Sequence, residues 1–135
     1  MRTIKLAQIE RTYKNNGQHA EQTARFTLTG KIEKADNKPF WFGGDCGDIQ
    51  IKSSRATICK GTNIRIHVMN DPAKFYGYVT SDFSEMYVMT KTEWIEFSEK
   101  FGTVTTDSNG KNGGHEKTRL KTENREMREW FRKNS

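Results

Sequence analysis

The pattern of apolar and polar positions predicts several short helices and strands. Asn16 can cap a helix that begins near Gly17 and runs to Gly30, because apolar positions within it recur at spacings of three and four. Residues 49–52 alternate between isoleucine and a polar side chain, which is typical of a half-buried strand. Three other apolar segments also predict strands, and they lie at residues 40–42, 76–80 and 85–89.

The rest of the chain predicts two further helices and contains one ambiguous segment. Thr90 and Glu93 form a capping-box signature that opens a helix ending at Gly102. A last helix over residues 122–133 would turn its apolar side chains inward. Residues 64–69 alternate like a strand, and a helix is the alternative interpretation. Residues 1–16 are expected to form a short helix or an arm, which completes the predicted order of elements.

Length and charge narrow the class of protein. A chain of 135 residues has room for a single domain, 1–135, with one core. Its 23 lysines and arginines exceed its 17 aspartates and glutamates, which gives a net charge of +6 and favours polyanionic partners, nucleic acid first. No apolar run is long enough to span a membrane, and the two cysteines do not suggest a disulfide framework. These features predict a cytoplasmic protein without a membrane partner.

Four residues with metal-binding or catalytic chemistry lie within eight positions of one another: Asp45, Asp48, Gln50 and Lys52. Positions 48, 50 and 52 share one face of a strand, and residue 45 stands just before it. Carboxylate and amide oxygens suit a hard cation such as Mg²⁺ or Mn²⁺, and an ammonium group can hold the attacking water or stabilise charge on phosphorus. The alternative is an ordinary half-exposed strand that follows a turn of glycines and aspartates.

Two neighbouring segments are candidates for contact with a phosphate backbone. Ser53, Ser54 and Arg55 follow the predicted strand directly, and their side chains can donate hydrogen bonds to phosphate oxygens. Residues 107–116 contain no apolar side chain, which predicts a mobile loop whose glycines and Lys111 would suit the same contact. A plain surface loop is the alternative interpretation of this second segment.

The motif of an aspartate followed by Gln50-Ile51-Lys52 resembles the core of the PD-(D/E)XK nuclease superfamily, in the Gln-x-Lys variant found in Mrr-like restriction nucleases. The resemblance covers roughly residues 17–90, and the predicted elements fall in a compatible order. It implies an α/β (α+β) fold with a restriction-endonuclease-like central mixed sheet flanked by helices. In that fold residues 64–69 would be helical, which is why a helix is kept as an alternative there.

The resemblance also assigns roles to individual residues. Asp45 or Asp48 would be the metal-binding aspartate, Gln50 would take the usual acidic position, and Lys52 would be the catalytic lysine. Glu21, on the first predicted helix, would be an auxiliary ligand or would position the water. The chain has no Pro-Asp dipeptide, and the gap between Asp45 and Gln50 is short, so Asp36 remains a further candidate for the metal-binding aspartate.

The expected function is therefore metal-dependent hydrolysis of phosphodiester bonds in DNA, by a restriction-like or structure-specific endonuclease. One chain of this size has one active site, so cutting both strands of a duplex would require a homodimer, sequential nicks or a structured substrate. The first alternative is a non-catalytic nucleic-acid-binding protein, or an inhibitor from a phage or mobile element, on the same fold. The second is a domain that binds protein through its last helix and the loop at 107–116.

Overall fold

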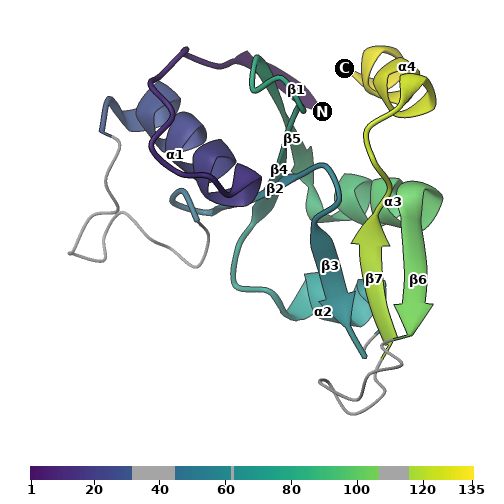
Figure 1. Cartoon of the computed structure of the whole chain (residues 1–135). Helices are drawn as coiled ribbons and strands as arrows, with labels where there is room; N and C mark the ends of the chain where they lie inside the picture. The colour runs from purple at the N-terminus through teal and green to yellow at the C-terminus, as the bar shows by residue number, and fades with distance from the viewer. Residues whose placement is uncertain (32–44, 62, 107–115) are drawn as a thin grey trace.

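The computed structural model describes residues 1–31, 45–61, 63–106 and 116–135, which form an α+β fold with a central sheet flanked by helices (Figure 1). The central sheet has four strands in the order β1-β5-β4-β2. Strand β5 is antiparallel to both β1 and β4, whereas β2 runs parallel to β4, so this sheet is mixed. The bounds of its strands are β1 Arg2–Lys5, β2 Ile49–Ser53, β4 Phe75–Val79 and β5 Glu85–Thr90.

A second sheet has three antiparallel strands in the order β3-β7-β6. Its strands are β3 Thr57–Lys60, β6 Gly102–Thr106 and β7 Glu116–Leu120. Only a short turn separates β2 from β3, and Arg55 in that turn has a positive φ of 64°. The turn carries the chain directly from the edge of the first sheet to the edge of the second.

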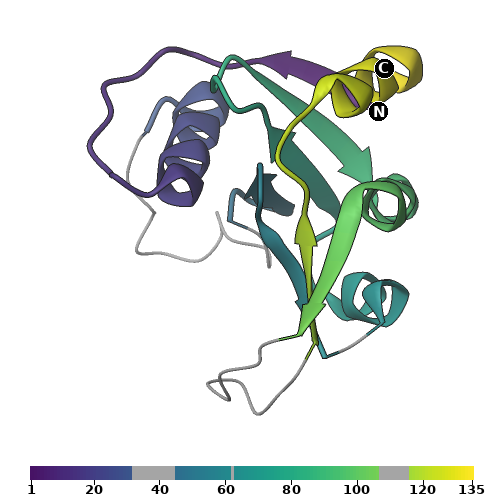
Figure 2. The same ribbon diagram turned by 45° about the vertical axis from the view of Figure 1, so that its right-hand side comes forward.

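The described residues form four helices that cover the sheets, with α1 and α3 on opposite sides of the four-stranded sheet (Figure 2). Their bounds are α1 Asn16–Thr29, α2 Ile64–Asn70, α3 Lys91–Phe101 and α4 Arg125–Asn134. Each helix is preceded by a residue whose side chain accepts a hydrogen bond from a backbone N–H of the first turn. These N-caps are Asn15, Asn63, Thr90 and Asn124. The capping box of Thr90 and Glu93 is present as predicted.

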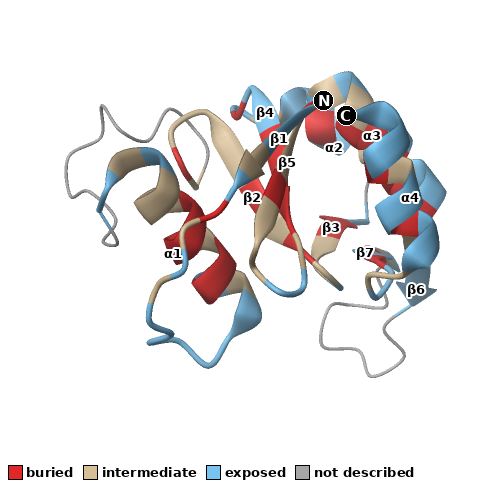
Figure 3. Ribbon diagram, turned by 90° about the horizontal axis from the view of Figure 1, so that it is seen from above, coloured by how far each residue is buried: buried red, intermediate tan, exposed pale blue. Residues whose placement is uncertain are grey.

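The two faces of the four-stranded sheet bury different side chains. On one face Ala20 and Ala24 of α1 form a cluster with Ile51 of β2, and the buried side of α1 is turned toward β2 (Figure 3). On the other face aromatic rings dominate: Tyr76 of β4 stacks on Trp94 of α3 with ring centroids 4.9 Å apart. Because neighbours along a strand point to opposite faces, Gln50 and Lys52 lie on the aromatic side, away from α1.

The structure corrects one predicted element and resolves another. The two alternatives for residues 1–16 are a short helix and an arm, and no helix forms before Asn16. Residues 2–5 instead form strand β1, because Ile4 and the buried Leu6 are two positions apart and turn inward together. Residues 64–70 form helix α2, in which Val68 is fully buried while Ile66 is 57 % exposed. Ile64 and Val68, four positions apart, therefore face the core together, and the apparent alternation is accidental.

The other helix boundaries lie within a few residues of those that the sequence predicts. Helix α1 is capped by Asn15, one residue before the predicted Asn16, and Gly30 ends it with a φ of 76°. The last helix begins at Arg125, three residues later than predicted. The predicted strand at 40–42 lies outside the described residues, as does all of the predicted loop at 107–116 except Glu116, which begins β7.

Candidate functional site

The carboxylate of Asp45 lies beside β2, which is the last strand of the four-stranded sheet in the part of the chain that the structure describes. Cys46 and Ile49 exchange both backbone hydrogen bonds across a tight turn, at 3.0 Å each, and Gly47 within the turn has a positive φ of 61°. This turn folds Asp45 back along β2, where its Oδ2 accepts a hydrogen bond of 3.0 Å from the backbone N–H of Ile51. Ile51 stands between Gln50 and Lys52, so a carboxylate is fixed beside the predicted Gln-x-Lys segment.

Lys52 bridges the two sheets. Its side chain is half-buried, and Nζ donates a hydrogen bond of 3.2 Å to the backbone carbonyl of Thr57, the first residue of β3. The parallel register sets Lys52 beside Tyr78 of β4, and Gln50 beside Tyr76 in the same way. The ammonium group is therefore held at the junction of the two sheets.

Asp48 and Gln50 are placed at the start of β2. The backbone carbonyl of Asp48 accepts hydrogen bonds from the N–H groups of Lys74 and Phe75, at 2.8 and 3.0 Å, which ties the start of β2 to the start of β4. Both Asp48 and Gln50 are half-buried. Gln50 and Lys52 share a face of β2, as the alternation predicted.

Glu21 lies on α1 and is linked to Asp45 through an arginine. Arg25 forms an ion pair with Glu21, with Nη2 3.2 Å from Oε2, and its Nε donates to the backbone carbonyl of Asp45 at 3.2 Å. Helix α1 packs on the Ile51 face of β2, opposite to the face that carries Gln50 and Lys52. Glu21 is thus associated with Asp45 and not with the lysine.

Burial makes Cys46 an ordinary core thiol. Its side chain is buried in the cluster between α1 and β2. Burial raises the pKa of the thiol, Arg25 opposes that shift, and the carboxylates of Asp45 and Asp48 add to it. A raised pKa keeps the group protonated near neutral pH, so nothing favours Cys46 as a nucleophile.

The predicted phosphate contacts fall in different environments. Ser53 is only 8 % exposed, and the Oγ of Ser54 accepts the backbone N–H of Glu123 at 2.9 Å. Arg55 is exposed in the turn between the sheets. Lys111 and Asp36 lie outside the described residues.

The donor set near β2 consists of oxygen atoms, from the carboxylates of Asp45 and Asp48 and the amide of Gln50. Mg²⁺ is commonly held by only one or two carboxylates together with water and substrate phosphates, so this chemistry fits Mg²⁺ or Mn²⁺. Within the described residues, no three histidine, cysteine, aspartate or glutamate side chains are gathered as a metal site. The amide of Gln50 is a different kind of donor, and the candidate Asp36 lies outside the described residues.

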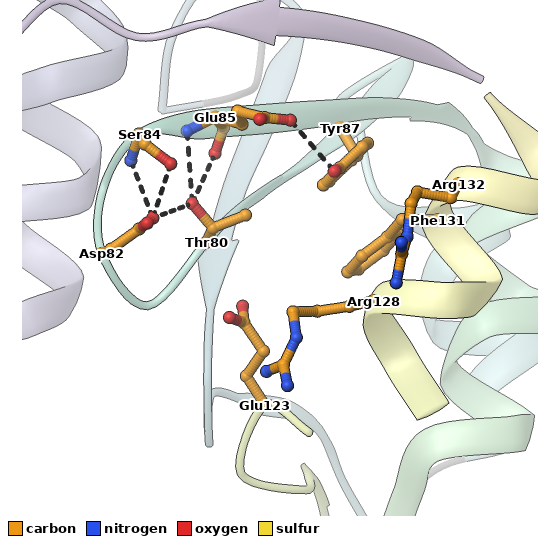
Figure 4. Close-up of a pocket in the computed structure, with 9 residues that line it drawn as sticks. All are labelled: Thr80, Asp82, Ser84, Glu85, Tyr87, Glu123, Arg128, Phe131 and Arg132. Atoms are coloured by element: carbon orange, nitrogen blue, oxygen red, sulfur yellow. Dashed lines mark hydrogen bonds between the residues drawn. The ribbon is translucent and has the colours of Figure 1, made fainter. Parts of the chain in front are cut away.

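A polar pocket of about 270 Å³ lies between the β4–β5 turn and helix α4 (Figure 4). Its carboxylates are engaged by neighbours: Asp82 accepts hydrogen bonds from Thr80 and Ser84, and Glu123 accepts the hydroxyl of Tyr78 at 2.9 Å. The hydrogen bonds from Ser84 and Thr80 hold the pKa of Asp82 below its usual value. These hydrogen bonds hold the β4–β5 turn together and join it to Glu123, just before α4.

Glu123 is the residue near the site that sequence reasoning missed. Besides Tyr78, it accepts the backbone N–H of Ser81 at 3.1 Å, and its own N–H binds Ser54 just after β2. These partners lie more than 40 positions away along the chain. No local pattern around residue 123 signals contacts at such a separation.

None of the helices that the structure describes is both long and apolar enough to cross a membrane. No family model, curated protein or solved structure matches the chain.

Proposed function

We propose that the protein is a metal-dependent nuclease that hydrolyses phosphodiester bonds of DNA. The observation that carries the proposal is the hydrogen bond from the Ile51 N–H to the Asp45 carboxylate. It fixes an anionic oxygen donor beside the strand that presents Gln50 and Lys52. The excess of positive charge, +6 over the chain, favours a polyanionic substrate.

The proposed roles follow from the chemistry of each group. Asp45 and Asp48, with the amide oxygen of Gln50, would hold the cation. When bound, Mg²⁺ or Mn²⁺ supplies a Lewis acid that polarises the phosphodiester and lowers the pKa of a bound water. Lys52 would orient the attacking water or stabilise the charge that develops on phosphorus. The ammonium is already confined by its bond to Thr57, which limits the entropy lost when it acts.

Glu21 has a smaller part in this scheme. Its ion pair with Arg25, which also binds the Asp45 backbone, gives it a role in positioning residue 45. A homodimer would supply a second active site for the opposite DNA strand, and sequential nicks or a structured substrate would serve a monomer.

A second candidate is a protein that binds nucleic acid without cutting it. One observation favours it: Asp45 and Lys52 both form hydrogen bonds to backbone groups, so each has a structural reason to be present. Gln50 is neutral, which leaves two carboxylates to hold the cation. A binder of this kind needs only the positive charge and no turnover.

The test is cleavage of linear, supercoiled and branched DNA with Mg²⁺, Mn²⁺ or EDTA. The wild type is compared with Lys52→Ala, with an Asp48→Ala, Lys52→Ala double variant, and with Lys133→Ala as a matched control for loss of one lysine. Lys133 is exposed near the end of α4, outside the proposed catalytic residues. We expect metal-dependent cutting by the wild type and the control, and none by the double variant.

Two results would decide against this proposal. Cleavage that survives in the double variant would show that these residues do not carry the chemistry. A wild type that binds DNA but cuts none of the substrates with either metal would favour the non-catalytic binder. Melting temperatures of all variants establish that any lost activity is not lost folding.

A further inference from the structure

The outer face of the three-stranded sheet carries a patch of positive charge. The register aligns two rows of side chains across β3, β7 and β6: Thr57, Arg119 and Thr103 in one, and Lys60, Lys117 and Thr105 in the other. Residues directly opposite one another in an antiparallel sheet point to the same face. We call these six residues the basic face.

The burial pattern confirms which side this is. Thr118 and Leu120 of β7 are buried toward the helices, while Arg119 between them is exposed and Lys117 is half-buried. Lys60, Thr103 and Thr105 are exposed as well. Helices α2 and α3 lie behind this sheet, and no described helix covers its front (Figures 1 and 2).

The charges on this face are of one sign. Glu116 is the single carboxylate in the three strands as described, and it is in register with Thr106 on the side of Thr118 and Leu120. Lys60 and Lys117 are directly opposite each other.

The basic face adjoins the candidate site. Thr57, at the end of the first row, is the residue whose carbonyl accepts the hydrogen bond from Lys52 Nζ. The hydrogen bond therefore joins Lys52 to the backbone of β3 at the end of the first row. The second row, with Lys60 and Lys117, lies at the other end of β3.

We propose that the basic face is the surface on which the phosphate backbone of duplex DNA lies, leading to Lys52. Cations and hydroxyl groups are the donors that contact phosphate oxygens without reading sequence. The strands of this face, as far as the structure describes them, present no aromatic side chain there, so the base stacking that holds single strands has no platform. The inference rests on the proposed function only where it connects this face with a catalytic lysine.

The test is binding of a fluorescent duplex in EDTA, where no cleavage occurs, measured by anisotropy over a series of salt concentrations. The variant Lys60→Gln, Arg119→Gln removes two cations from the face. The matched control, Arg2→Gln, Lys133→Gln, removes two exposed cations from β1 and α4. Each phosphate contact contributes a slope of about −0.9 to log K against log salt.

We expect the slope of the face variant to be shallower by about 2. If the two proteins bind equally at ~1 M salt, this difference makes the variant bind about 100-fold more weakly than the wild type at ~0.1 M salt. The control should bind like the wild type. Thr103→Lys, which adds a cation to the first row, should tighten binding and steepen the slope by about 1. This gain cannot arise from a folding defect.

The inference is overturned if the face variant and Thr103→Lys keep the wild-type slope, if the wild type does not bind the duplex, or if it prefers a single strand of equal length. These binding results do not depend on whether the protein is a nuclease. Loss of binding by the face variant in a protein that cuts nothing would support the basic face and refute the nuclease. Cleavage that the face variant leaves unaffected at moderate salt would support the nuclease and refute the basic face.

Discussion

Two substitutions at Asp45 separate its structural role from its proposed role as a ligand. Asp45→Asn keeps an oxygen that can accept the hydrogen bond from Ile51 N–H, now 3.0 Å long, but removes the charge. Asp45→Ala removes both, and leaves a half-buried N–H without its partner. If Asp45 binds a cation, both variants should lose cleavage, whereas only the second should lose the edge contact.

The stability difference can be estimated from the contact itself. A hydrogen bond to a charged group contributes about 1.5–3 kcal/mol and a neutral one about 0.5–1.5 kcal/mol, so we expect losses of about 2 kcal/mol for alanine and about 1 kcal/mol for asparagine. For a domain of this size, 1 kcal/mol corresponds to about 4 °C in Tm. The alanine variant should therefore melt about 8 °C below the wild type, and the asparagine variant about 4 °C below.

The assay pairs thermal unfolding, followed by tryptophan fluorescence, with metal-dependent DNA cleavage by each variant. Asp48→Asn is the control for stability, because the hydrogen bonds that Asp48 accepts from Lys74 and Phe75 involve its backbone carbonyl and remain. An asparagine variant that cuts DNA as fast as the wild type would refute the assignment of Asp45 as a metal ligand. An alanine variant with an unchanged Tm would refute the reasoning about the edge contact.

Three further predictions follow from other contacts. Lys52→Met keeps the apolar stem but loses the hydrogen bond to Thr57, so the free energy of unfolding, measured by denaturant titration, should fall by at most about 1.5 kcal/mol. The cleavage rate should fall about 10²- to 10³-fold, because one positioned donor is lost. Gly102→Ala would place a methyl group against the backbone carbonyl of Ser98, and should destabilise by about 1–3 kcal/mol in urea unfolding. Burial, then a hydrogen bond to a neighbouring carboxylate, raises the pKa of Tyr87 to about 12. Because the pKa of Tyr87 in the folded protein lies above the ordinary value of 10, the stability that the protonated hydroxyl contributes is complete below pH 10 and is lost as pH rises through 12. Ultraviolet absorbance of phenolate, compared with a Tyr87→Phe variant, measures this titration.

Local patterns were enough to predict the elements whose signals are short in range. The alternation at residues 49–52 appears as β2, and the capping box at Thr90 opens α3 as expected. The contact of Asp45 with Ile51 also spans only six residues, so the proximity of that carboxylate to the Gln-x-Lys segment agrees with the sequence. The predicted roles of these residues in metal binding and catalysis stay predictions.

The parts that sequence reasoning missed depend on distant partners. Strand β7 has the mainly polar sequence Glu-Lys-Thr-Arg-Leu, and it is a strand because β3 and β6 pair with it on either side. The separation of Glu21 from Lys52 arises because α1 packs on the isoleucine side of β2, which the spacing of either residue does not reveal. In both cases tertiary packing decides what local propensity leaves open.

The tight turn before β2 also affects how the protein behaves at high concentration. Among the described residues β2 is the last strand of the four-stranded sheet, and an uncovered strand at such a position is a template onto which another chain can add. Cys46 binds both outward backbone groups of Ile49, and the Asp45 side chain accepts the outward N–H of Ile51. The residue proposed to hold a cation thus also keeps separate molecules from joining strand to strand, and Asp45→Ala should form aggregates under conditions in which Asp45→Asn stays dispersed.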